Sequence, residues 1–186
     1  NIPIINGLTD LSHPCQVLAD LMTIREYKGK LDGLKMCYIG DGNNMANSLI
    51  VGGLKTGMSV SVACPENYHP AATTLAFAKK YDCFELTDDP IKAAKDADVI
   101  FTDVWASMGQ EGEAEIRKKA FKGFQINDEV MAVAKPDAMV MHCLPAHRGE
   151  EISTAVFEAH ADEIFTEAEN RLHVQKAVLA VLLAGK

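Results

Sequence analysis

Short apolar runs of strand length alternate with helix-length segments along most of this chain. The predicted strands are residues 34–39, 59–63, 83–86, 99–102, 138–141 and 163–165. The predicted helices are residues 14–27, 45–55, 70–80, 90–95, 114–121, 128–134, 154–160 and 170–184. Such alternation predicts a parallel sheet with helices on both faces. With right-handed crossovers, this is a doubly wound, Rossmann-like α/β fold.

Length and charge narrow the class of protein. The 186 residues suffice for one compact α/β domain with its own core. A formal net charge of −8 disfavours nucleic-acid binding, because nothing in the composition would neutralise phosphates. Five cysteines, an odd number without a CxxC pair or a secretory segment, predict a reduced cytoplasmic protein. No apolar run reaches the ~18 residues that span a membrane.

Polar segments follow several of the predicted strands. They are residues 41–44, 103–109, 142–148 and 167–171. In doubly wound sheets, ligands bind beyond the carboxyl ends of the strands. We therefore expect these four segments to gather along one edge and to form a ligand site.

The segment 40–44 (GDGNN) follows a strand and opens a helix, as a dinucleotide-binding fingerprint does. Met45 stands where that motif has its third glycine, and Glu66 is only a loose candidate for the ribose-binding acid. A tight turn with capping Asn side chains is the alternative. A third possibility is that an amide and the helix N-terminus together bind a carboxylate.

The segment 103–109 (DVWASMG) combines a carboxylate, a hydroxyl and a flexible glycine. A lone Asp after a strand is typical of a helix cap or a turn. This set also suits an ammonium group, which needs hydrogen-bond acceptors.

The segment 142–151 (HCLPAHRGEE) follows another strand. Cys143 is typical of inert core, and zinc bound by His142, Cys143 and His147 is disfavoured because no second Cys/His pair accompanies them. Pro145 predicts a forced turn that aims Cys143 and Leu144 outward. We expect the Leu144–Pro145 peptide to be cis, a form that costs only ~0.5–1 kcal/mol before proline.

Two further candidates lie near the ends of the chain. His13 and Gln16 stand at a predicted helix start, where they form a capping turn or donate hydrogen bonds to a carbonyl or phosphate oxygen. Arg171 is flanked by acids, as in many surface salt bridges. At a helix start on the ligand edge it would instead clamp an anionic group.

Five signatures together resemble the ornithine carbamoyltransferase family. They are HPCQ at 13–16, GDGNN at 40–44, DVWASMG at 103–109, HCLPAHRGEE at 142–151 and ENRLH at 169–173, in the family's order. The resemblance implies transfer of a carbamoyl group from carbamoyl phosphate to the δ-amine of L-ornithine, giving L-citrulline and phosphate. It implies no organic cofactor and no metal.

The resemblance also implies roles for single residues. His13, Gln16 and Arg171 would belong to the carbamoyl phosphate end, and Cys143 and the Leu144 carbonyl would lie beside the δ-amine. The ornithine α-carboxylate and α-ammonium would be held by Asn44, Asp103, Ser107 and Met108.

The chain departs from the family at the phosphate site. The family's Ser-Thr-Arg-Thr-Arg loop is absent, and the arginines are Arg25, Arg117, Arg148 and Arg171. Since Asn1 is not Met, we expect the chain to start partway into a longer protein. Residues 1–31 would then be an interdomain helix and a remnant of an N-terminal carbamoyl phosphate domain. Residues 32–186 would be the ornithine-binding domain, ending in a second interdomain helix.

Several alternatives stay open at this stage. The full-length enzyme is expected to be a cytoplasmic homotrimer, serving either arginine synthesis or breakdown. A carbamoyltransferase for another amine such as putrescine, a nicotinamide-dependent oxidoreductase and a non-catalytic binding module remain the competing interpretations.

Overall fold

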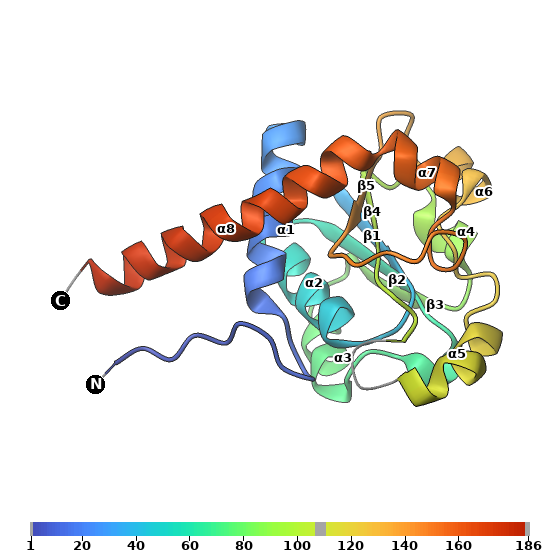
Figure 1. Ribbon diagram of the computed structural model, residues 1–186, viewed down its shortest axis with the longest axis horizontal. Helices are drawn as coiled ribbons and strands as arrows, with labels where there is room; N and C mark the ends of the chain where they lie inside the picture. Colours follow the sequence, from blue (N-terminus) through green and yellow to red (C-terminus); the bar gives the residue numbers. More distant parts are fainter. Residues whose placement is uncertain (1, 107–110, 185–186) are drawn as a thin grey trace.

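A computed structural model describes residues 2–106 and 111–184 of the chain. Its core is a five-stranded sheet with the order β3-β2-β1-β4-β5 (Figure 1). The strands are β1 (Lys35–Ile39), β2 (Ser59–Ala63), β3 (Phe84–Thr87), β4 (Val99–Thr102) and β5 (Met139–His142). Every recorded pairing is parallel, so the carboxyl ends of all five strands share one edge.

The central strands are apolar runs because helices cover both of their faces. On β1, Tyr38 belongs to the core on one face while Ile39 belongs to the core on the other. Successive strand residues point to opposite faces, so a strand buried on both sides has no polar alternation.

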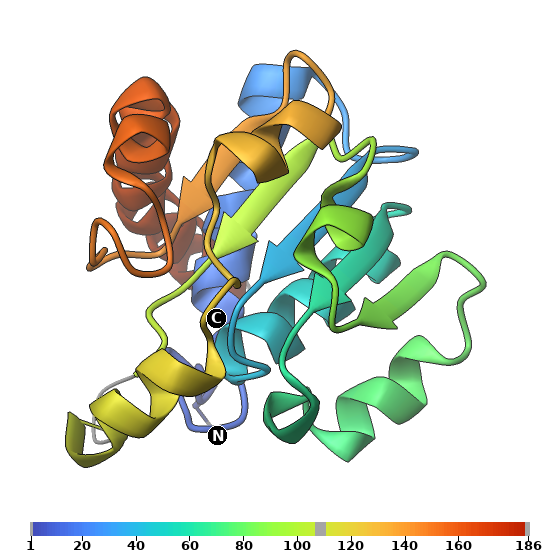
Figure 2. The ribbon, with the colours of Figure 1, turned by 90° about the vertical axis from the view of Figure 1, so that its right-hand side faces the viewer.

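The helices form two layers around the sheet, as Figure 2 shows with the strand arrows running side by side. The first core lies beneath α1, α2 and α3, and the second beneath α4, α6 and α7. The helices are α1 (Pro14–Lys28), α2 (Asn44–Lys55), α3 (Ala72–Ala78), α4 (Pro90–Ala94), α5 (Ala114–Ala120), α6 (Asp128–Val133), α7 (Thr154–Ala159) and α8 (Ala161–Leu183). The 3₁₀ turns are η1 (Glu66–Tyr68) and η2 (Glu111–Glu113). The predicted doubly wound fold is confirmed.

The prediction of a sixth strand at 163–165 is wrong, because these residues lie in the first turns of α8. The buried residues of that helix recur at helical spacing, at Ile164, Glu167, Asn170 and Val174. Acidic Asp162 and Glu163 in the first turn favour a helix start at Ala161 rather than at residue 170.

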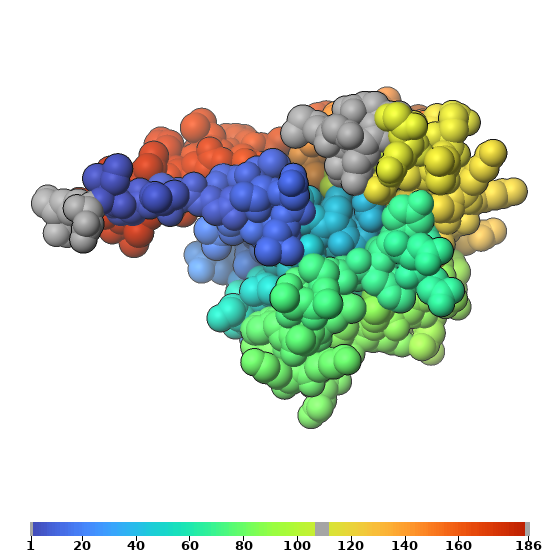
Figure 3. Space-filling model, turned by 90° about the horizontal axis from the view of Figure 1, so that it is seen from below, coloured from blue at the N-terminus to red at the C-terminus, as the bar shows by residue number. Residues whose placement is uncertain are grey.

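The long helix α8 packs against α1 and β5 and then continues away from the sheet (Figure 1). Its end and the N-terminal segment project from the same side of the molecule (Figures 1 and 3). Apolar side chains line a shallow hollow between α1 and α8, among them Leu18, Val178 and Val181. Among the described residues, no helix combines the length and apolarity that crossing a bilayer demands.

Candidate active site

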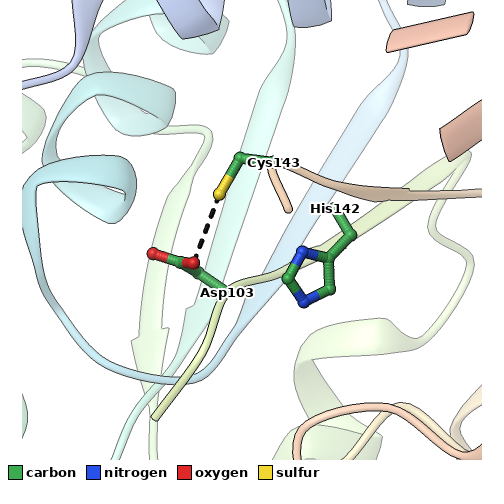
Figure 4. A group of neighbouring side chains, drawn as sticks. All are labelled: Asp103, His142 and Cys143. Carbon is green, nitrogen blue, oxygen red and sulfur yellow. Dashed lines mark hydrogen bonds between the residues drawn. The ribbon is translucent and has the colours of Figure 1, made fainter. Parts of the chain in front are cut away.

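The loops after β4 and β5 bring a carboxylate and a thiol together. Cys143 Sγ donates to Asp103 Oδ1 at 3.2 Å (Figure 4). The same oxygen accepts from the Val104 amide at 2.8 Å, and Asp103 Oδ2 accepts from Asn43 Nδ2 at 2.7 Å. Asp103 is buried, so its carboxylate is held in one orientation by groups from three loops.

Asn43 has two tasks at the start of α2. Its Oδ1 accepts from the Met45 and Ala46 amides, as an N-cap does. Its Nδ2 therefore faces Asp103. The sequence singled out the next residue, Asn44, whose Nδ2 donates to the Thr9 carbonyl at 2.8 Å. Asn44 is half-buried at the same edge of the sheet.

Gly42 shows why the loop after β1 resembles a nucleotide fingerprint. A Cβ at this position would lie 2.3 Å from backbone atoms of His69 and Pro70. The glycine therefore lets two protein segments approach each other, which accounts for it without a phosphate. Together with Met45, this packing argues against the dinucleotide interpretation.

Asp41 is occupied by a buried arginine that the sequence analysis missed. Arg117 Nη1 donates to Asp41 Oδ2 at 2.7 Å and to the Trp105 carbonyl at 2.9 Å. The guanidinium also lies 5.1 Å from the centre of the Tyr68 ring. Burial raises the pKa of the Asp41 carboxyl above its ordinary value, and the charge of Arg117 opposes that rise. Through these two hydrogen bonds, Arg117 on α5 ties the loop after β1 to the loop after β4.

Cys143 is a neutral thiol in this setting. Burial raises the pKa of the thiol well above its ordinary value, and the carboxylates of Asp103 and Glu167 raise it further. A thiol can donate to Asp103 and offer its sulfur lone pairs as weak acceptors. It is not a thiolate nucleophile at neutral pH.

His142 contributes to the position of Leu144 rather than to a metal site. Its Nδ1 accepts from the Leu144 amide at 3.0 Å, which leaves the ring proton on Nε2, 3.1 Å from Glu151 Oε1. Asp103, His142 and Cys143 each have an atom that could coordinate a metal ion, and these atoms lie within 4.8 Å of one another. Because both ring nitrogens are engaged and Cys143 keeps its proton, this set does not fit a metal ion.

The Leu144–Pro145 peptide is cis, as predicted. Leu144 itself has φ 56°, in the left-handed region that residues with a Cβ occupy at a cost of ~1–2 kcal/mol. Such outliers persist where the surroundings determine them, and they gather at functional sites.

A second polar cluster lies between α1 and α8. Arg171 Nη1 donates to Gln16 Oε1, and His13 Nε2 lies 3.5 Å from the same nitrogen. The prediction that Arg171 stands at a helix start is wrong, because α8 begins at Ala161 and Arg171 lies in its middle. Burial and the charge of Arg171 lower the pKa of His13, so its imidazole is neutral at pH 7.

Gln16 differs from its predicted role as a donor. Its Nε2 donates to Asp20 Oδ1 at 2.8 Å and to Glu167 Oε1 at 2.9 Å, so both amide protons are used inside the protein. The remaining group, Oε1, is an acceptor. Sequence analysis did not single out Asp20, which lies one helical turn after Gln16. It placed Glu167 in the polar segment 167–171 but gave no role to this residue, which lies one turn before Arg171.

Glu167 connects the two clusters. Its Oε1 accepts from Gln16, and its Oε2 accepts from the His142 amide at 2.9 Å, next to Cys143. The structure therefore joins His13, Gln16 and Arg171 to Asp103 and Cys143 through one buried carboxyl. Ser107 and Met108, also predicted for this site, lie outside the described residues.

Comparisons with known proteins agree on one family. Residues 32–182 match the Asp/Orn-binding domain of aspartate/ornithine carbamoyltransferase, and residues 1–26 match its carbamoyl-P-binding domain. A curated ornithine carbamoyltransferase from Pyrococcus abyssi is 56% identical over 190 residues, covering 100% of this chain and 60% of the relative. The chain thus spans about 60% of the length of such relatives.

Solved structures give the same result. Ornithine carbamoyltransferase from Pyrococcus furiosus has a TM-score of 0.91 and 53% identity, and the match covers 100% of this chain and 61% of that one. The anabolic ornithine carbamoyltransferase from Campylobacter jejuni has a TM-score of 0.92 and 44% identity, covering 99% and 63%.

Proposed function

This chain belongs to the aspartate/ornithine carbamoyltransferase family, and from that premise we propose that it holds the amino-acid end of an ornithine carbamoyltransferase site. The reaction moves the carbamoyl group of carbamoyl phosphate to the δ-amine of L-ornithine, giving L-citrulline and phosphate. The observation that carries this proposal is the hydrogen-bonded pair of buried Asp103 and half-buried Cys143, linked through Glu167 to Gln16 and Arg171.

We assign the ornithine-binding end of the site to hydrogen-bond acceptors and to one side-chain amide. Asp103 would pair with the α-ammonium, because its buried carboxylate is already oriented by neighbouring donors. Asn44, Ser107 and Met108 would complete the binding of the α-amino acid group. Cys143 and the Leu144 carbonyl would receive the δ-amine. A neutral thiol suits this place, since it adds no charge that would favour an ammonium over the nucleophilic amine.

The carbamoyl end is assigned to His13, Gln16 and Arg171. Arg171 carries the positive charge that a departing phosphate needs, and neutral His13 can donate from its imidazole to the carbamoyl oxygen. Gln16 Oε1 would accept from the carbamoyl NH₂. The δ-amine lone pair then attacks the carbamoyl carbon, and the electron pair of the broken C–O bond leaves with the phosphate. The attacking nitrogen gives up one proton, which the departing phosphate takes up.

The whole protein is expected to include more than these described groups. We propose that residues 1–31 join residues 32–186 to the carbamoyl phosphate-binding part, and that the exposed apolar residues Leu18, Leu179 and Val181 face it. By family, the enzyme would be a cytoplasmic homotrimer of arginine metabolism that needs no cofactor.

The test is formation of the carbamoylated amine by the protein as its gene encodes it, with carbamoyl phosphate and either L-ornithine, which gives citrulline, or putrescine, which gives N-carbamoylputrescine. We expect turnover with ornithine and at least 100-fold less with putrescine, which lacks the α-carboxylate. Preference for putrescine would assign the other amine. Absence of turnover with both would contradict carbamoyl transfer.

A further inference from the structure

Two carboxyl groups meet in the interior beside Gln16. Asp20 on α1 and Glu167 on α8 are both 0% exposed, and each accepts one proton of the Gln16 amide. Asp20 Oδ2 is buried without a hydrogen-bond partner among the described residues. An unpartnered, fully buried carboxylate oxygen is costly, so this atom needs a proton or a donor.

A shared proton satisfies the pair. Placed between Asp20 Oδ2 and Glu167, it forms an O–H···O hydrogen bond and leaves one negative charge on the two groups. Arg171 then supplies one positive charge to the same cluster. Burial raises the pKa of Asp20 to about 7 and that of Glu167 well above its ordinary value, where the neighbouring Asp20 carboxyl adds to the rise. If both carboxyl groups were ionised, two buried negative charges would repel each other, and Arg171 would balance only one of them.

We propose that Asp20 and Glu167, joined by one proton, are positioning residues that lock the Gln16 amide with its Oε1 acceptor toward the carbamoyl group. This inference rests on the proposed function. Carboxylate oxygens accept both protons of Gln16 Nε2, so the amide cannot rotate by half a turn without losing two buried hydrogen bonds.

The locked amide would act in substrate selection. The Gln16 acceptor pairs with the NH₂ of a carbamoyl group but receives no hydrogen bond from the methyl group of acetyl phosphate. A site built to bind an NH group rejects analogues that lack it more strongly than an apolar pocket does. Asp20 and Glu167 would thus favour the carbamoyl donor without touching it.

Two isosteric amide variants separate this proposal from a merely structural role. In Asp20→Asn, Oδ1 still accepts from Gln16 while Nδ2 donates to Glu167, which reproduces the shared-proton state with the same total charge. In Glu167→Gln, a new NH₂ must face either Gln16 Nε2 or the His142 amide, and both are donors. Both substitutions replace a carboxyl by an amide but have opposite effects on the orientation of Gln16.

The first measurement is steady-state kinetics of the protein as its gene encodes it. We expect Asp20→Asn to keep kcat/KM for carbamoyl phosphate within about threefold. We expect Glu167→Gln to lower it by a factor on the order of 100, as when one oriented hydrogen-bonding group is lost. The folded fraction of each variant is checked by denaturant titration. Equal losses in both folded variants would overturn the positioning role.

The second measurement does not depend on activity. Infrared difference spectra of this chain at pH 8, above the pKa of Asp20, are expected to show a buried protonated carboxyl band that Asp20→Asn removes. The side-chain NH₂ of Gln16 should give two resolved, slowly exchanging amide proton signals, which are retained in Asp20→Asn and altered in Glu167→Gln. A missing carboxyl band, or a rapidly exchanging Gln16 amide, would overturn the proposal even if citrulline forms. If citrulline does not form while both signatures are present, the proposed function fails and the locked amide remains.

Discussion

Replacing Asp103 by Asn tests the ornithine end of the site most directly. The Asp103 carboxylate accepts from Val104, Asn43 and Cys143, and the substitution turns one of its oxygens into a donor. If the substituted side chain keeps its oxygen toward Val104 and Cys143, its new NH₂ meets Asn43 Nδ2. Asn43 cannot rotate in response without giving up the cap of α2.

Two separate losses follow from this geometry. The donor–donor contact costs about 1–3 kcal/mol of folding free energy, because one buried polar group is left unpaired. The lost charge costs the complex about 1.5–3 kcal/mol with the ammonium, which corresponds to a rise of roughly 10–150-fold in the ornithine KM. The first loss is measured by denaturant titration and the second by citrulline kinetics at saturating carbamoyl phosphate.

A double variant separates these two losses. In Asn43→Asp combined with Asp103→Asn, residue 43 still caps α2 and accepts from residue 103, so stability should return. The charge has moved to another loop, so ornithine binding should stay weak. An unchanged KM and turnover in Asp103→Asn, or recovery of ornithine binding in the double variant, would refute the assignment of Asp103 to the α-ammonium.

Three further outcomes are expected. Arg117→Leu should destabilise the chain by about 3–5 kcal/mol in denaturant titration, because Asp41 is left buried and unpaired; Lys118→Gln, which breaks an exposed pair, should have a far smaller effect. The folded pKa of Asp20 is about 7, above its unfolded value of 3.8, so its contribution to stability is complete below pH 3.8 and is lost as pH rises toward 7. The unfolding free energy of the unsubstituted chain should therefore fall by up to about 1.4 kcal/mol per pH unit relative to Asp20→Asn, and parallel pH curves would contradict this. The 186 residues alone should form no citrulline until a carbamoyl phosphate-binding domain is added, because the arginine-rich phosphate loop is absent; appreciable turnover by the chain alone would contradict this.

The sheet was predictable because its determinants are local. The strands β1, β2, β4 and β5 are short, mostly buried segments bounded by turn residues, whereas β3 alternates apolar and polar residues and is only partly buried. The failed strand at 163–165 is instructive. Its one fully buried residue, Ile164, is compatible with a strand in a short window, and only the recurrence of buried positions through Val174 identifies a helix.

The candidate site was predictable only in part. Asp103 and Cys143 follow strands, so the topology alone places them at one edge. Asn43 and Asn44 are adjacent and chemically identical, and only the tertiary contact with Asp103 shows which amide faces it. The partners Arg117–Asp41 and Asp20–Glu167 are far apart in sequence, so their pairing depends on how the helices pack.

The position of Glu167 explains how the two ends of the site keep a fixed separation. Its carboxyl holds the Gln16 amide on one side and the backbone amide of His142 on the other. Cys143 follows His142 directly, so one buried side chain of α8 orients both the proposed carbamoyl acceptor and the proposed δ-amine position. Loops are the mobile parts of a fold, and a misplacement of about 1 Å between reacting atoms can cost 100-fold in rate. A rigid helix that contacts both segments reduces this error. This gives α8 a mechanical role beyond that of the interdomain helix that its sequence predicted.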